Sequence, residues 1–94
     1  MLAMEETHLI AMALREYLRT LVNATELKDM DIDIACGEPF SALEEGLNIA
    51  HQYSIAVPPL FAEKITAIPL IPNDYLVVYR SLLSALPVYW QKAS

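Results

Sequence analysis

Residues 29–47 read DMDIDIACGEPFSALEEGL, and this stretch organises the predicted fold. Gly37 is typical of the position just beyond a helix end, where glycine adopts the left-handed conformation at little cost. Pro39 is well placed to begin another helix, because the first helical position does not use the N–H that proline lacks. The stretch therefore predicts a turn between a segment that ends near Cys36 and a helix that begins near Glu38.

The segment before this turn, residues 26–36, fits two interpretations. Acidic and apolar residues alternate from Asp29 to Ile34, which is the period of a strand. Leu27, Met30 and Ile34 also fall on one face of a helix. We expect a short helix here, because the chain offers no obvious second strand for pairing, and a strand is the alternative.

The helix after the turn is expected to be a central element of the core. Gly46 lies in its interior, where glycine costs roughly 1 kcal/mol relative to alanine. Its presence indicates either a close crossing with another helix or a weak helix. Beyond the helix, residues 54–57 are expected to be extended, because Val57 precedes a proline. The predicted buried face of the helix comprises Phe40, Leu43, Leu47 and Ala50, with Ile49 and Tyr53 beside it.

Three more helices are expected on either side of this stretch. The first runs over residues 5–23, the second begins at Pro58-Pro59 and stops at Pro69, and the last follows Asn73 as its N-cap. Apolar residues recur at helical spacing in each of them. Their predicted buried faces are Ile10, Ala13, Leu14, Tyr17, Leu18 and Leu21 in the first, Phe61, Ile65 and Ile68 in the second, and Tyr75, Tyr79, Leu82, Leu83 and Leu86 in the third.

The predicted fold class is therefore all-α: a small bundle of three to five helices with Pro-rich connectors. A chain of 94 residues is long enough for one modest core. The connector over residues 68–72 is stiff and apolar rather than flexible, so it does not indicate a domain boundary. We expect a single helical domain over residues 1–94.

Composition indicates an ordered, cytoplasmic protein. Apolar residues make up 55% of the chain, which excludes the low hydrophobicity of disordered chains and leaves some apolar surface for a possible homodimer. The N-terminus becomes acidic within its first residues, unlike a signal peptide. The longest uncharged run, residues 46–62, is interrupted by polar residues and prolines, unlike a membrane helix. The single Cys36 cannot form an internal disulfide and is expected to be a small buried hydrophobe.

No motif indicates an enzyme or a bound cofactor. The spacing of Asp29, Asp31 and Asp33 suggests a calcium loop, but that loop requires glycine where Ile34 stands and glutamate where Phe40 stands. Cysteine 36 and histidine 51 lie on different elements with no third catalytic partner, and two scattered histidines do not make a metal site. We expect no catalytic, cofactor-binding or metal-binding residues.

The acidity of the chain is concentrated in one window. Between Glu26 and Glu45 there are seven acids and one base, so this window carries the formal net charge of the whole protein, −6. Such a patch disfavours binding to nucleic acid and favours fast, salt-sensitive association with a basic protein. The candidate partner-binding residues are Glu26, Asp29, Asp31, Asp33, Glu38, Glu44 and Glu45.

The run from Gly37 to Glu45, with Leu47 and the extended Tyr53–Val57 exit, resembles small α-helical bacterial immunity proteins of polymorphic-toxin systems, including the Maf and contact-dependent-inhibition types. The resemblance covers about residues 36–65, a third of the chain. It implies a compact cytoplasmic protein that binds one cognate toxin domain, often a nuclease, and blocks it. The matched residues Glu38, Ala42, Leu43, Glu44 and Leu47 would mostly set the geometry of the helix.

Two other functions remain open. The same acids are compatible with a DNA-mimic anti-defence inhibitor. The surplus of apolar residues is compatible with a helical structural or dimerisation subunit. Aromatic residues near the C-terminus, Tyr89 and Trp90 in particular, are candidate interface anchors, with core packing as the alternative.

Overall fold

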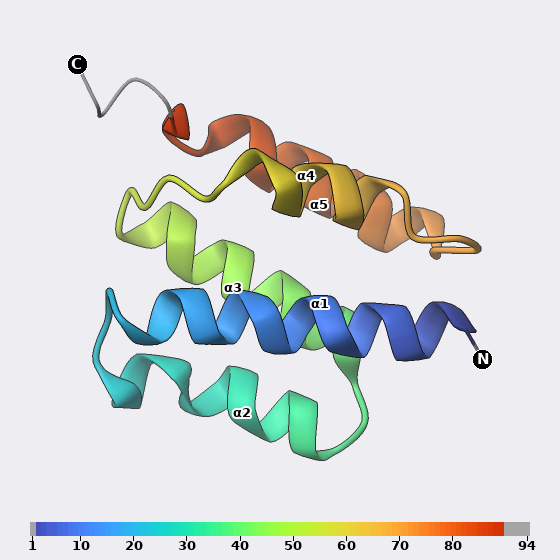
Figure 1. Cartoon of the computed structure of the whole chain (residues 1–94), viewed down its shortest axis with the longest axis horizontal. Helices are drawn as coiled ribbons and strands as arrows, with labels where there is room; N and C mark the ends of the chain where they lie inside the picture. The colour runs from blue at the N-terminus through green and yellow to red at the C-terminus, as the bar shows by residue number, and fades with distance from the viewer. Residues whose placement is uncertain (1, 90–94) are drawn as a thin grey trace.

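The computed structural model describes the backbone of residues 2–89 and the side chains of residues 4–89. Throughout this range the chain is helical or irregular and has no strand, so the prediction of an all-α fold is confirmed. Figure 1 shows the helices in chain order. The elements are α1 (Leu2–Arg19), a 3₁₀ helix η1 (Ala24–Leu27), α2 (Lys28–Ala35), α3 (Pro39–Gln52), α4 (Pro59–Thr66) and α5 (Asn73–Ala85).

Helix α3 is the central element of the bundle. It packs against α1, α2 and α5, while α4 packs against α1 and α5. In Figure 1, α2 lies on one side of the α1–α3 pair, and α4 and α5 lie together on the other side. The molecule is thus a unit of three helices, α1, α2 and α3, which is covered on one side by the pair α4 and α5.

The core is built mainly from the first three helices. Leu14 and Leu18 of α1, Met30 of α2, and Leu43 and Leu47 of α3 are all fully buried. By contrast, the buried residues within α4 and α5 are Ile65 and Tyr79, one from each helix. The residues predicted to form the buried faces of α3, α4 and α5 lie in the core or pack against it, as expected.

The ambiguous segment before Gly37 is helical. Side-chain burial explains why, because a strand would place Ile32 on the same face as Met30 and Ile34. In the helix Met30 is fully buried and Ile34 is half-buried, whereas Ile32 is 49% exposed. Gly37 follows α2 with a φ of +74°, in the left-handed conformation that the sequence predicts for it.

Gly46 marks a close crossing of three helices, which was one of the two predicted explanations for it. A Cβ atom at this position would lie 2.7 Å from Cδ2 of Leu14 on α1 and 2.9 Å from Cε of Met30 on α2. Both distances are shorter than ordinary van der Waals contacts. A methyl group at position 46 would therefore require the ends of the Leu14 and Met30 side chains to move.

Hydrogen bonds from the buried Tyr79 and the half-buried Tyr17 attach the later segments to the central helices. The Tyr79 hydroxyl on α5 donates to the backbone carbonyl of Phe40 at 2.6 Å, and the rings of Phe40 and Tyr75 stack 5.4 Å apart. The Tyr17 hydroxyl on α1 donates to the carbonyl of Ala56 at 2.5 Å. This bond holds the extended connector between α3 and α4 against α1.

Three expectations about single residues were wrong. Cys36 is exposed, because it caps the end of α2 at the turn instead of lying on the buried face. Asn73 is the first residue of α5 and not its N-cap, because the carbonyl of Pro72 already accepts the first helical hydrogen bond, from Leu76. Leu21 is 51% exposed, because α1 ends at Arg19, before this part of its predicted stripe.

The buried face of α1 also differs in detail from the predicted stripe. Ala13 is exposed, whereas Thr7 and Ala11 are fully buried. The buried face thus follows Thr7, Ala11, Leu14 and Leu18, which is the same helical spacing rotated slightly around the axis. Trp90, a candidate interface anchor, lies outside the described residues.

Candidate functional site

Three of the candidate acids lie close enough to a fourth, Glu45, to act on its carboxyl: Asp29 and Asp33 from α2, and Glu44 from α3, which also acts on Tyr79 of α5. Asp29 and Asp33 are one helical turn apart on α2, and Glu44 and Glu45 are adjacent on α3. Partial burial raises the pKa of the Glu45 carboxyl, and the charges of Asp29, Asp33 and Glu44 raise it further. We call these four residues the acidic surface.

The acidic surface is not paired with a cation among the residues that the structure describes. Within the described part of the chain, none of its four carboxylates forms an ion pair. The single base of the acidic window, Lys28, instead lines a shallow hollow on α2 together with Asp31 and Ile32. Within residues 4–89, the negative charge of the acidic surface is therefore not balanced by a salt bridge.

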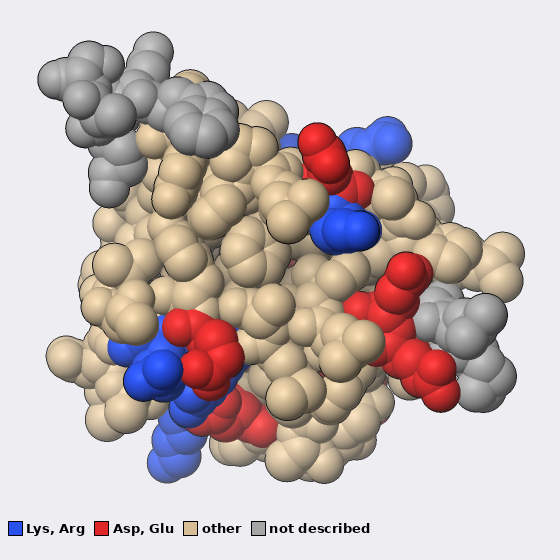
Figure 2. All heavy atoms as spheres, in the orientation of Figure 1, with Lys and Arg blue, Asp and Glu red and all other residues tan. Residues whose placement is uncertain are grey.

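Asp31 is separated from this group and neutralised within the chain. Nε of Arg15 on α1 lies 2.8 Å from Oδ1 of Asp31, and Nη2 lies 3.1 Å from Oδ2. This two-pronged contact lowers the pKa of the Asp31 carboxyl. Figure 2 shows such mixed positive and negative groups side by side over α1 and α2. Asp31 thus ties α2 to α1, a contact that no local pattern predicts, since the two partners are 16 residues apart.

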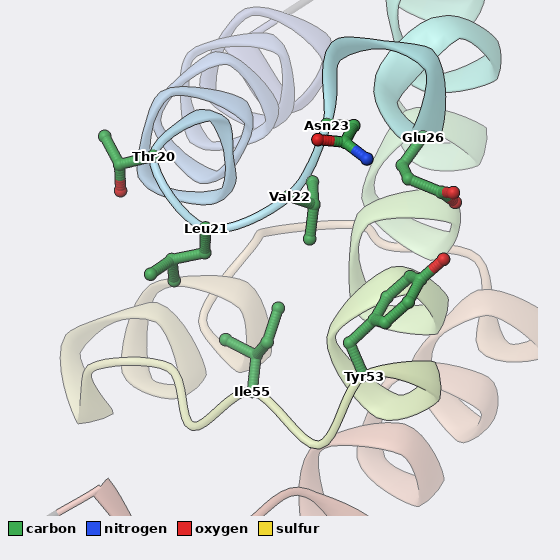
Figure 3. Close-up of a pocket in the computed structure, with 7 residues that line it drawn as sticks. All are labelled: Thr20, Leu21, Val22, Asn23, Glu26, Tyr53 and Ile55. Atoms are coloured by element: carbon green, nitrogen blue, oxygen red, sulfur yellow. The ribbon is translucent and has the colours of Figure 1, made fainter.

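Glu26 lies beside a second feature, an open cavity of about 510 Å³ at the end of α1. Figure 3 shows the Tyr53 hydroxyl directed toward the Glu26 carboxylate across this cavity. As a hydrogen-bond acceptor, Glu26 raises the pKa of the Tyr53 hydroxyl. The remaining lining residues are Thr20, Leu21, Val22, Asn23 and Ile55. The cavity therefore carries a tyrosine hydroxyl that is hydrogen-bonded to a carboxylate, together with the polar side chains of Thr20 and Asn23.

Glu38, the last of the seven, stands at the turn between α2 and α3. Its carbonyl accepts the N–H of Ala42 at 3.0 Å, while its exposed side chain makes no capping hydrogen bond. It is not among the charges that act on Glu45. The structure thus brings together four of the predicted residues and places Glu26, Asp31 and Glu38 elsewhere.

The structure does not bring the candidate nucleophile and base together. Cys36 precedes α3 and His51 lies in its last turn, and a helix of 14 residues is about 21 Å long. Both side chains are exposed. Among the described residues no three of histidine, cysteine, aspartate and glutamate are grouped closely enough to hold a metal ion.

Comparison of the chain with protein-family models, with curated proteins and with solved structures found no match. Within the part of the chain that the structure describes, no helix has both the length and the apolar character needed to cross a membrane. The class that the fold defines is therefore a small all-α bundle, and its function has to be argued from its surface.

Proposed function

We propose that this chain is an immunity-type inhibitor, which binds a basic toxin domain in the cytoplasm through the acidic surface. The observation that carries the proposal is the convergence of Asp29, Asp33, Glu44 and Glu45, unpaired with any described cation and close enough to raise the pKa of Glu45. The resemblance of residues 36–65 to immunity proteins points to the same class of partner.

The physical reasoning concerns the repulsion between these carboxylates. Like charges on neighbouring helices destabilise the folded chain, so their proximity has no benefit for folding alone. A cationic partner would remove the repulsion and would be attracted over a distance, which raises the rate of association. A nuclease domain, whose nucleic-acid site is lined with lysine and arginine, fits this requirement.

The rigid frame beneath the acidic surface also suits an inhibitor. Asp29 precedes the fully buried Met30 and Asp33 follows it by three residues, while Glu44 and Glu45 follow the fully buried Leu43. Carboxylates anchored in this way on packed helices lose little freedom when a partner binds. A binding protein of this kind requires no catalytic group.

The test measures association with a basic partner captured from the cell in which the chain is made. Asp29→Asn combined with Asp33→Asn removes two charges from the acidic surface and leaves the Arg15–Asp31 pair intact. We expect association to slow by about tenfold or more and its salt dependence to weaken. The measurement is stopped-flow binding at low and high ionic strength.

The matched control removes two charges elsewhere, with Glu63→Gln on α4 and Asp74→Asn on α5, both exposed. It should associate at nearly the wild-type rate. Equal rates for both double variants would contradict a role for the acidic surface. If the captured partner is instead a DNA-processing enzyme from which duplex DNA displaces the chain, the DNA-mimic alternative would replace the toxin inhibitor.

A further inference from the structure

A groove between α1 and α4 is the feature of the surface that the acidic residues leave unexplained. Its volume is about 540 Å³, and its floor and walls include Ile10 and Ala13 of α1 and Phe61 of α4. Figure 2 shows uncharged surface between the charged groups over α4 and those at the two ends of α1. An apolar groove of this kind on a small protein marks an interaction site.

The same face carries apolar side chains that project from it. Leu9 on α1 is 65% exposed and Leu60 on α4 is 59% exposed, and both border the groove. The face thus combines exposed apolar side chains with an apolar groove. A surface of this shape can pack against its own copy, with the projections of each molecule in the hollow of the other.

The charges at the edge of the groove are also complementary to each other. Glu6 of α1 and Lys64 of α4 border it, and both are exposed. Neither forms an ion pair within the described part of the chain. Among the residues that line the groove, this acid and this base balance each other, in contrast to the acidic window, which carries −6.

We infer that two copies of this chain associate through their α1–α4 faces around a two-fold axis. Leu9 and Leu60 of each copy enter the groove of the other, and Glu6 of each copy faces Lys64 of the other. In a two-fold interface every contact occurs twice, so a single acid and a single base suffice for two ion pairs. The inference does not depend on the proposed inhibitor function.

The occupant is a second copy and not a cationic protein, because a groove whose lining charges balance does not attract a cation. Association through the acidic windows would bring like charges together, whereas the α1–α4 face avoids this repulsion. An interface of standard size takes roughly 800 Å² from each partner, and the chain exposes 5818 Å². The dimer therefore leaves most of the surface open, including room for a separate partner.

Sedimentation equilibrium of the full chain tests this inference. We expect a monomer–dimer equilibrium with a Kd in the micromolar range, and Leu60→Glu should raise that Kd by at least about tenfold. Val77→Glu on α5 is the matched control, since Val77 is 58% exposed and does not line the groove. It should leave the Kd unchanged, and circular dichroism checks that both variants stay folded.

A charge exchange tests the pairing itself. Glu6→Lys alone and Lys64→Glu alone should each weaken the dimer several-fold, and the variant with both changes should recover most of the wild-type Kd. A chain that stays monomeric up to about 200 µM, far above a micromolar Kd, would overturn the inference. Equal weakening by Leu60→Glu and Val77→Glu would also overturn it, as would a double exchange without recovery. If the chain is monomeric and Leu60→Glu instead weakens binding of the captured basic protein, the groove belongs to that partner.

Discussion

The three-helix unit α1–α3 and the pair α4–α5 are held in place by different interactions. In the first, aliphatic side chains such as Leu14, Met30 and Leu47 are fully buried where three helices meet at Gly46. In the second, aromatic contacts and the hydrogen bond from Tyr79 attach α5 to α3, and each helix contributes one buried residue. Close packing thus stabilises the centre, whereas directional contacts position the cover.

The largest loss of stability is expected from a substitution in the packed centre. Leu47→Ala removes a fully buried side chain from α3 and should lower the free energy of unfolding by about 3 kcal/mol. Leu82→Ala, at a half-buried position on α5, should cost only about 1 kcal/mol. Urea denaturation measures both. Equal losses would mean that the two regions do not differ in the way that their burial indicates.

The second effect concerns the crossing at Gly46. Gly46→Ala gains roughly 1 kcal/mol of helix propensity but brings a methyl group against Leu14 and Met30, at a cost of about 1–3 kcal/mol. We expect a net loss of about 1 kcal/mol. The same change in the Leu14→Ala background should cost less, because the contact with Leu14 is gone and only the contact with Met30 remains. Independent, additive losses in the double variant would contradict the close crossing.

A smaller effect is expected at the ion pair that joins α2 to α1. Asp31→Asn should lower the free energy of unfolding at pH 7 by about 0.5 kcal/mol, since Asp31 and Arg15 are partly exposed to solvent. The pKa of Asp31 is lowered in the folded state, so its contribution is present above the unfolded pKa and is lost as the pH falls through the folded pKa. Wild type and variant should therefore converge in acid. A gap between them that persists at pH 2 would argue against the pairing.

The sequence predicted what depends on spacing along one helix and missed what depends on contacts between helices. The period of Leu43, Leu47 and Ala50 was enough to identify the buried face of α3, whereas Gly46 left open whether it marked a close crossing or a weak helix. The pairing of Arg15 with Asp31 depends on how α1 and α2 are placed side by side, which no local pattern encodes. For the same reason, the window of seven acids did not reveal which four share a surface.

The smallest effect concerns the acidic surface itself. The pKa of Glu45 is raised in the folded state by partial burial and by Asp29, Asp33 and Glu44, so ionisation of Glu45 opposes folding. Stability linked to this group is complete below its unfolded pKa and falls as the pH rises through its folded pKa. Glu45→Gln should therefore raise the free energy of unfolding at pH 7 by about 0.3 kcal/mol, and the gain should disappear near pH 4.

Glu63→Gln on α4 is the control for this last change, because Glu63 is exposed and is not among the charges that act on Glu45. It should leave the pH profile of stability as it is in the wild type. A gain from Glu45→Gln that is the same at pH 4 and pH 7 would show that charge is not its cause. A gain confined to neutral pH, together with slower association with a basic partner, would mean that these carboxylates serve binding at the expense of folding.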